Sequence, residues 1–273
     1  FCAEVGRVKF PKMHGLGNDY IYLDCMQGEP ENLPELARTL SRRRFGVGAD
    51  GLICICPSRW GDFRMRMFNA DGSEGEMCGN GIRCLGKYVY DTGLTDKTRL
   101  SIETPAGLRA LELHLSGAQV SAVTVEMGVP RVKHPRTLEA AGMMCTVTPV
   151  SMGNPHAVLF VGEVETAAVS RLGPGLECHP AFPNRTNVEF VQVLAPDRLR
   201  MRVWERGSGE TMACGTGAAA SLAAACVRGL CGHRTAVELP GGELAITWAG
   251  EGAPLYLTGP AVTVFNGEYL DKL

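Results

Sequence analysis

Two cysteines lie in nearly identical surroundings, about half a chain apart. Cys78 lies in Met-Cys-Gly-Asn-Gly (77–81) and Cys214 in Ala-Cys-Gly-Thr-Gly (213–217), and 214 − 78 = 136. Each precedes an apolar run with helical spacing. A thiol at a helix N-terminus faces unpartnered backbone N–H groups and the positive end of the helix dipole, which favour the thiolate. Two such thiols can remove a proton from one face of a carbon and return one to the other.

The same spacing relates other segments. Gly17-Asn18 matches Gly153-Asn154, since 154 − 18 = 136, and Phe68-Asn69 matches Trp204-Glu205, since 205 − 69 = 136. Three matches in one register predict a duplicated unit and two pseudo-symmetric domains. We expect the domains to span residues 1–128 and 129–261, and residues from about 262 to 273 are a candidate to return to the first domain.

The expected elements follow one order in both halves. Apolar periodicity predicts a helix over 31–44, a loop over 71–81 and a helix from 82 to 93 in the first half, and a loop over 207–217 and a helix over 218–229 in the second. Strands are expected at 20–25, 52–56 and 64–68, and again at 157–161, 188–193 and 199–203. The helix over 218–229 is apolar on almost every side, so a sheet should wrap around it.

Composition restricts the partners. The net charge is −2, and the densest basic run, Arg42–Arg44, has three residues, so nucleic acid and anionic membranes are not expected partners. The longest apolar stretch, Ala218–Val227, is too short to span a bilayer. Eleven cysteines without framework spacing indicate reduced thiols in the cytoplasm, or in the plastid stroma if the source is a plant. No histidines or second cysteine pair lie at zinc-site spacing, so no metal site is expected.

A wider set of motifs makes the chain resemble diaminopimelate epimerase over nearly its whole length. These motifs are Met-His-Gly-Leu-Gly-Asn-Asp (13–19), Asn-Ala-Asp-Gly-Ser (69–73), Gly-Asn-Pro-His (153–156), Glu-Arg-Gly (205–207) and the two cysteine segments. The resemblance implies an α/β (α+β) fold of two similar domains, each a curled, mostly antiparallel sheet around a central hydrophobic helix, with the active site between them. It also implies a cofactor-independent enzyme that interconverts LL- and meso-2,6-diaminopimelate in lysine and peptidoglycan precursor synthesis. A homodimer is left open.

The resemblance also assigns roles by position. Cys78 and Cys214 would be the thiolate and the thiol on either side of the substrate's α-carbon, with His156 and Glu205 supporting their protonation states. Arg206 would pair with the distal carboxylate. The other implied substrate-binding residues are Asn18, Asn69, Gly79, Asn80, Asn154, Asn187, Glu205, Gly215 and Thr216.

One position departs from many family members, and two others break the internal symmetry. Gly51 stands where a substrate-contacting glutamine is often found, which removes a side-chain contact; it answers Asn187, since 187 − 51 = 136. Arg206 answers Ala70, and Glu205 answers Asn69. A substrate with one reacting end and one additional charged end requires such asymmetry, and a guanidinium suits a carboxylate.

Other interpretations remain open from the residues. Taken singly, Asn18 and Asn154 are typical turn residues, and a Glu-Arg pair is typical of a solvated surface. Phosphate binding is not indicated, because neither glycine-rich loop matches a nucleotide-binding fingerprint. The main alternative is a related racemase for proline, hydroxyproline or histidine, although proline racemases more typically carry histidine where Asn80 stands. Isomerases of the phenazine-biosynthesis type and a non-catalytic binding module are further alternatives.

Overall fold

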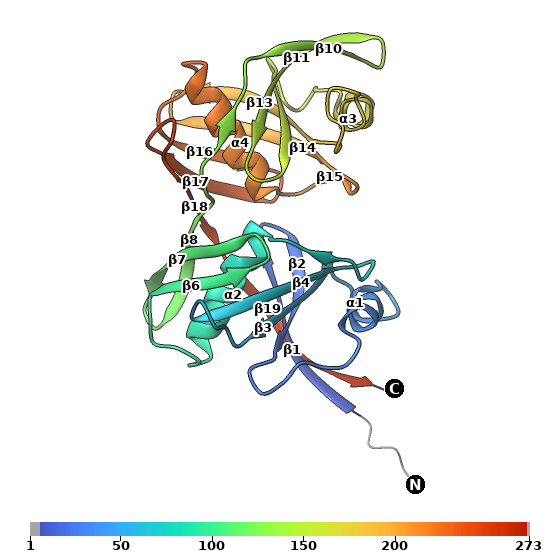
Figure 1. The fold of residues 1–273 in the computed structure, drawn as a ribbon, viewed down its shortest axis with the longest axis vertical. Helices are drawn as coiled ribbons and strands as arrows, with labels where there is room; N and C mark the ends of the chain where they lie inside the picture. The colour runs from blue at the N-terminus through green and yellow to red at the C-terminus, as the bar shows by residue number, and fades with distance from the viewer. Residues whose placement is uncertain (1–5, 272–273) are drawn as a thin grey trace. The chain divides into compact units, whose positions relative to one another are not determined.

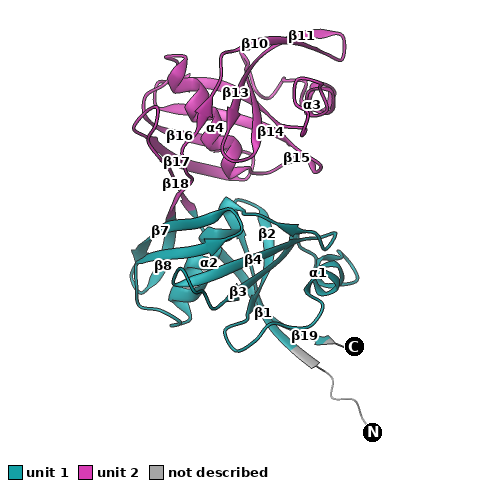
Figure 2. Cartoon of the chain, in the orientation of Figure 1, with its two compact units in different colours: residues 1–123, 260–273 teal, residues 124–259 magenta. Residues whose placement is uncertain are grey.

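The computed structural model describes residues 6–271, which form two compact units (Figures 1 and 2). Unit 1 combines the chain up to residue 123 with the segment from residue 260 onward, and unit 2 is the continuous stretch 124–259. Strands β8 (Gln119–Glu126) and β18 (Leu255–Pro260) connect the two units along the chain. Each unit is described below by itself.

Unit 1 is a mixed, mainly antiparallel sheet with two helices. Strand β1 pairs with β2 and with the C-terminal strand β19, β2 runs parallel to β3, and β4 joins antiparallel β3 to parallel β6. The elements are β1 (Gly6–Gly15), β2 (Asn18–Asp24), α1 (Leu33–Ser41), β3 (Gly51–Cys56), β4 (Phe63–Asn69), β5 (Glu74–Gly75), α2 (Gly79–Asp91), β6 (Arg99–Thr104), β7 (Gly107–Ser116) and β19 (Val262–Asp271).

Unit 2 repeats this arrangement. Strand β12 runs parallel to β13, and β14 joins antiparallel β13 to parallel β16. The elements are β9 (Arg131–Val132), β10 (Arg136–Ala140), β11 (Met143–Ser151), β12 (Pro155–Phe160), α3 (Val169–Glu177), β13 (Asn187–Ala195), β14 (Arg198–Glu205), β15 (Gly209–Thr211), α4 (Gly215–Val227), β16 (Arg234–Leu239) and β17 (Gly242–Trp248).

The 136-residue register holds at the level of single strand pairs. Tyr20 pairs with Gly51 in unit 1, and the equivalent His156 pairs with Asn187 in unit 2. The helices also coincide: α3 begins 136 residues after α1 (169 − 33), and α4 begins 136 residues after α2 (215 − 79). The duplication inferred from sequence therefore extends to the hydrogen-bonding register of the sheets.

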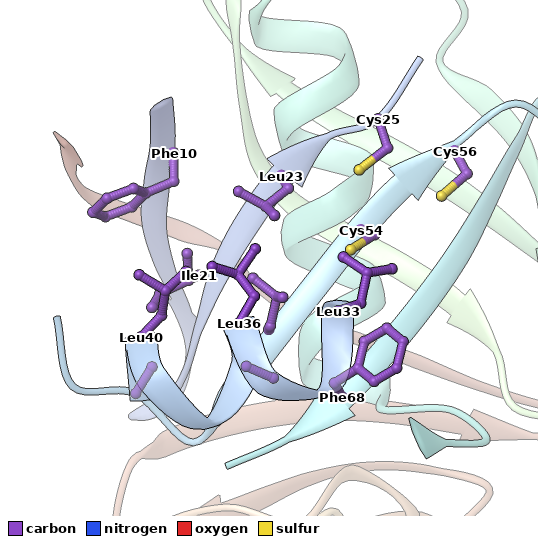
Figure 3. Close-up of a cluster of buried hydrophobic side chains, with 13 residues drawn as sticks. Phe10, Ile21, Leu23, Cys25, Leu33, Leu36, Leu40, Cys54, Cys56 and Phe68 are labelled. Atoms are coloured by element: carbon purple, nitrogen blue, oxygen red, sulfur yellow. The ribbon is translucent and has the colours of Figure 1, made fainter. Parts of the chain in front are cut away.

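Each central strand is covered on both faces. Along β3, Leu52, Cys54 and Cys56 point to a core beneath α1, which contributes Leu36 and Leu40 (Figure 3). The intervening Ile53 approaches Gly81 of α2, on the other face. Because successive strand side chains alternate between faces, a strand buried on both sides is apolar throughout, as β3 is.

The same construction surrounds α4. Its alanine-rich residues are buried almost without exception, and it contacts strands β11 to β14, β16 and β17. A second helix, α3, packs on the outer face of the sheet through Val169, Leu172 and Leu176. The expected fold class, a mainly antiparallel sheet curled around a central hydrophobic helix in each half, is confirmed.

Several boundaries differ from the sequence-based expectation. Both central helices begin three residues earlier than the apolar pattern indicates, at Gly79 and Gly215, so the last three residues of each expected loop are helical. The expected helix over 31–44 is shorter, because Asn32 caps it and Arg42 is already extended. The expected loops also contain the short strands β5 and β15. Helix α3 was not anticipated; it contains Pro174.

No helix within residues 6–271 is both long and apolar enough to cross a membrane.

Candidate active site

Cys78 occupies the N-cap of α2 in an extended conformation, with φ −127°. Its sulfur accepts a hydrogen bond from the backbone N–H of Gly81 (3.3 Å) and donates to the Asn18 side-chain oxygen (3.2 Å). The Asn80 amide donates to the same oxygen at 3.3 Å. The first turn of α2 thus brings together Cys78, Asn80 and Asn18, as the sequence predicts. These residues, together with Tyr20, Ile53, Asn69 and Arg83, are called the Cys78 half-site below.

A buried cation lies behind this cysteine. The Arg83 side chain is fully buried, and it donates to the carbonyl oxygens of Gly79 (3.0 Å) and Pro260 (3.2 Å) and to Asn80 Oδ1 (3.0 Å). All three acceptors are neutral, and burial lowers the pKa of Arg83. A negative charge on Cys78 would interact favourably with the guanidinium. Arg83 therefore favours the thiolate form of Cys78.

A tyrosine and an asparagine complete this half-site. Tyr20 is buried beside Cys78; burial, and then negative charge at Cys78, raises its pKa well above the ordinary value. The phenol therefore stays protonated. Asn69 lies at the end of β4, and its amide donates to Ser73 Oγ at 3.0 Å. No hydrogen bond links Asn69 to Cys78 among the contacts described.

Cys214 occupies the equivalent N-cap of α4, with φ −123°, but it makes no capping hydrogen bond. It is more deeply buried than Cys78, with 6% of its surface exposed. Its sulfur lies 3.6 Å from Thr216 Oγ1. Burial, and then the negative charges of Glu205 and Glu189, raise the pKa of Cys214 well above the ordinary value. The thiol form is therefore favoured here.

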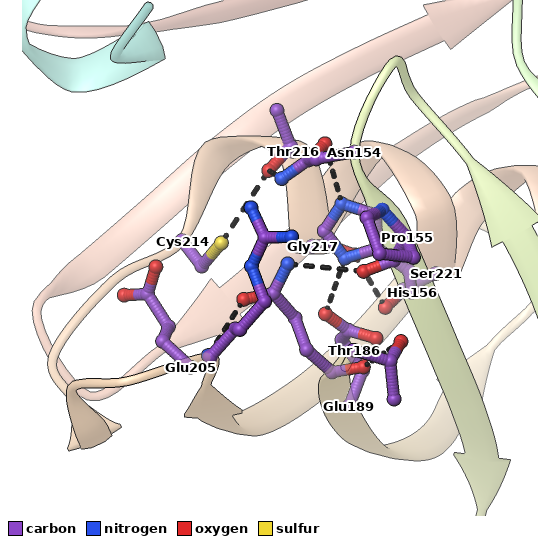
Figure 4. Close-up of polar contacts among 12 residues, drawn as sticks. Asn154, Pro155, His156, Thr186, Glu189, Glu205, Cys214, Thr216, Gly217 and Ser221 are labelled. Atoms are coloured by element: carbon purple, nitrogen blue, oxygen red, sulfur yellow. Dashed lines mark hydrogen bonds and ion pairs between the residues drawn. The ribbon is translucent and has the colours of Figure 1, made fainter. Parts of the chain in front are cut away.

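Three further side chains surround this cysteine. Glu205 accepts a hydrogen bond from the Thr211 hydroxyl, and burial raises the pKa of its carboxyl. His156 is buried, with Nδ1 2.6 Å from Glu189 Oε1 and Nε2 3.0 Å from Asn154 Oδ1. Figure 4 shows Cys214, Thr216, Asn154, His156, Glu189 and Glu205 together. These six residues, with Ala219, are called the Cys214 half-site.

Asn187 and Arg206 lie at the edge of this half-site. The Asn187 amide donates to the Pro155 carbonyl (3.1 Å) and accepts from the backbone N–H of Arg206 (2.9 Å), so both ends of the side chain hold backbone. The exposed Arg206 guanidinium donates to the Asn184 carbonyl at 3.2 Å. No carboxylate of the described residues forms an ion pair with Arg206. Its charge therefore remains available to an anionic group.

Gly51 has a steric explanation. A Cβ atom there would lie 2.2 Å from the Phe68 carbonyl oxygen and 3.0 Å from the Tyr20 ring. The oxygen belongs to the paired strand β4 and cannot give way without a shift of the sheet. A glutamine at this position would require a different strand spacing.

Sequence reasoning missed four of these positions: Tyr20, Ile53, Arg83 and Glu189. Each has an identifiable signal in the repeat. Tyr20 answers His156 (156 − 20 = 136), and Ile53 answers Glu189 (189 − 53 = 136). Arg83 answers Ala219, since 219 − 83 = 136. Pairs in which a charged residue answers an apolar one identify the places where the two half-sites differ. Among residues 6–271, no group of three or more His, Cys, Asp or Glu side chains could hold a metal ion.

Comparison with known proteins decides the family. The profile of the family described as diaminopimelate epimerase matches residues 10–133 and 148–264. The chain belongs to the diaminopimelate epimerase family. One relative, diaminopimelate epimerase of Methanococcus maripaludis, is 49% identical over 274 residues, covering 96% of this chain and 99% of the relative.

Solved structures show how widely this fold is used. A phenazine biosynthesis protein of the PhzF family from Bacillus anthracis matches with a TM-score of 0.78 at 19% identity, over 97% of this chain and 99% of the other. A hydroxyproline epimerase from Agrobacterium vitis matches with a TM-score of 0.74 at 16% identity, over 96% and 92%. At these identities the likeness concerns the fold alone. The distinction between the epimerase and its alternatives therefore depends on the sequence relatives and the site residues.

Proposed function

We propose that this chain is a cofactor-independent epimerase that interconverts LL- and meso-2,6-diaminopimelate, in the synthesis of lysine and peptidoglycan precursors. The similarity to a diaminopimelate epimerase over almost the full length of both chains carries the proposal. The two cysteines at helix N-caps support it, because they supply the acid and the base that inversion needs. We further propose that the protein acts in the cytoplasm.

The mechanism follows from the protonation states that the half-sites favour. Cys78, beside the buried Arg83, removes the α-proton as a thiolate, and Cys214 delivers its thiol proton to the opposite face. The proton taken by Cys78 and the proton given by Cys214 leave the total unchanged, but the thiolate has moved to Cys214. The reverse reaction starts from that state.

The intermediate is a carbanion whose charge extends onto the adjacent carboxylate. The first N–H groups of a helix have no intrahelical partner and point along the helix axis, so α2 and α4 offer fixed donors to that carboxylate. The implied nest residues Gly79, Asn80, Gly215 and Thr216 all lie in these first turns. Arg206 is suited to the distal carboxylate, because a guanidinium can bind it through two parallel hydrogen bonds.

Incubation with LL-diaminopimelate in heavy water tests the proposal. Deuterium should appear at the inverted α-carbon of the meso product, while remaining substrate keeps its protium, because different thiols remove and deliver the proton. Proton NMR and mass spectrometry measure both pools. L-Lysine, which lacks the distal carboxylate, should exchange far more slowly. Exchange with proline or histidine instead of diaminopimelate would move the assignment to a related racemase.

Replacement of either cysteine gives a second test. Cys78→Ala and Cys214→Ala should each lower epimerisation by at least about 100-fold, since each removes a general acid–base group. Cys178→Ala is the matched control, because this exposed thiol lies outside both half-sites. A Cys78 or Cys214 variant with the activity of the Cys178 control would contradict the two-thiol mechanism.

A further inference from the structure

A buried glutamate in unit 2 has no role in the mechanism above. Glu189 lies on β13 with none of its surface exposed. Oε1 is 2.6 Å from His156 Nδ1, and Oε2 has no hydrogen-bond partner among the described residues. A carboxylate in such surroundings carries a large desolvation cost. The equivalent strand position in unit 1 holds Ile53, so the fold itself does not require a carboxylate there.

The glutamate lies directly beneath the first turn of α4. A Cβ atom added to Gly217 would be 2.8 Å from Glu189 Oε1 and 3.3 Å from the Cys214 sulfur. The carboxylate and the thiol are thus separated only by the space that the missing side chain leaves. Glycine at 217 is what permits this approach.

A chain of hydrogen bonds connects the two groups (Figure 4). It runs from Glu189 Oε1 to His156 Nδ1, and from His156 Nε2 to Asn154 Oδ1 at 3.0 Å. The Asn154 amide nitrogen then donates to Thr216 Oγ1 at 3.3 Å, and Thr216 Oγ1 lies 3.6 Å from the Cys214 sulfur. All the links are side chains of unit 2.

The direction of these hydrogen bonds follows from the two ends. Asn154 gives its N–H to Thr216, so its oxygen faces His156, and His156 Nε2 must donate. Thr216 accepts from Asn154, which leaves its own hydroxyl proton for Cys214. Nε2 carries a proton when Nδ1 is held by a carboxyl group, whichever of the two shares the Nδ1 proton. Without a partner at Nδ1, the neutral ring could place its proton there and reverse the chain.

We propose that Glu189 is a positioning residue for Cys214: it holds His156 in the Nε2–H form, and thereby aligns Asn154 and Thr216 so that the Thr216 hydroxyl donates to the sulfur. This role rests on the proposed function, in which Cys214 exchanges a proton with the substrate. When Cys214 gives up its proton, the aligned hydroxyl stabilises the thiolate that forms. The titratable groups around Cys214 in unit 2 are Glu205 from β14, Glu189 from β13 and His156 from β12.

Two substitutions in the full-length protein separate orientation from charge. In Glu189→Gln, the new amide can donate to His156 Nδ1, so the Nε2–H form and the direction of the chain are kept while the charge is lost. In Glu189→Ile, the residue that unit 1 carries at this position, Nδ1 loses its partner. Glu243→Gln is the matched control: this carboxylate on β17 pairs with Arg198 at 3.0 Å, away from the half-site.

We expect kcat for Glu189→Gln within about 3-fold of the unsubstituted enzyme, and kcat for Glu189→Ile lower by about 10- to 100-fold with little change in KM. The alkaline limb of the kcat/KM profile should move to lower pH in Glu189→Gln, because removal of a negative charge lowers the pKa of Cys214. Equal activity of Glu189→Ile and the unsubstituted enzyme would overturn the proposal. So would equal losses in both variants, since only the charge would then matter.

A second measurement does not depend on the substrate. Nitrogen-15 NMR of labelled histidine should show a slowly exchanging Nε2 proton on buried His156 in the unsubstituted protein and in Glu189→Gln, and its loss in Glu189→Ile. Absence of that proton in the unsubstituted protein would overturn the proposal even in an active enzyme. Its presence in a protein that fails to epimerise diaminopimelate would support the positioning role while the proposed function fails. If Glu189→Ile does not fold, Glu189→Gln and the unsubstituted protein decide by these same criteria.

Discussion

Ile53 and Glu189 occupy matching places beneath the first turns of α2 and α4, in strands with the same pairing register. Around Cys78 the buried charge is the guanidinium of Arg83, and around Cys214 it is carried by Glu189 and Glu205. A duplicated backbone has thus acquired opposite electrostatics in its two copies. One copy favours a thiolate and the other a thiol, which is the pairing that proton transfer in a fixed direction requires.

Loss of the cation should have the largest effect on this comparison. In Arg83→Met we expect about 10- to 100-fold less thiolate at Cys78 at neutral pH, because the favourable charge interaction is gone. The rate of Cys78 alkylation and the epimerisation rate should fall together. Arg83→Lys, which keeps the charge but not the planar fork, should lie between the two. Unchanged alkylation of Cys78 in a folded Arg83→Met protein would show that the guanidinium is purely structural.

The unsubstituted protein offers a second way to sharpen the contrast. With iodoacetamide at neutral pH, Cys78 should react at least about 10-fold faster than Cys214, since only a thiolate reacts and the pKa of Cys214 is raised. Labelling of Cys214 should become appreciable only above the ordinary thiol range. Peptide mapping by mass spectrometry measures both rates, with exposed Cys178 as an internal reference. Faster labelling of Cys214 would reverse our assignment of the two roles.

The smallest effect concerns the two glycines beneath the cysteines. Gly81→Ala would bring a Cβ within 2.5 Å of Ile53 Cδ1, a terminal methyl that can rotate away. Gly217→Ala would meet Glu189 Oε1, which His156 holds in place. Both changes gain about 1 kcal/mol of helix propensity, so Gly217→Ala should be the less stable variant by about 1–2 kcal/mol. Urea unfolding followed by circular dichroism measures the difference. Equal stabilities would indicate that the Glu189–His156 contact is loose.

Much of the fold could be predicted from periodicity and the internal repeat, but helix α3 could not be predicted from its own residues. Gly173, Pro174 and Gly175 lie in its middle and are poor helix formers. The structure explains Gly173: a Cβ there would lie 2.5 Å from the Trp204 ring, so glycine lets α3 pack closely on β14. The repeat register carried the information that local propensity lacked, since 177 − 41 = 136 places the end of α3 opposite the end of α1.

The candidate site divides in a similar way. The cysteines and the asparagines near them were recognisable because each sits in a motif with a turn and a helix start. Glu189 was not, because a single glutamate in a strand is more typical of a solvated face, and sequence alone does not show that α4 covers it. Arg83 lies within a helix and gave no signal that its neighbours would be neutral carbonyls. Burial and partner identity are three-dimensional properties, and these were the ones that sequence reasoning missed.

Strand β19 pairs with β1 along most of its length, although the two strands lie at opposite ends of the chain. During synthesis the ribosome therefore releases all of unit 2 before the last strand of unit 1 emerges. The unit that starts first must wait with an open sheet edge, while the later one, continuous in sequence, can complete its own core. Nascent chains halted just after residue 259 should thus contain a finished second unit and an unfinished first one, the reverse of the usual order along a growing polypeptide.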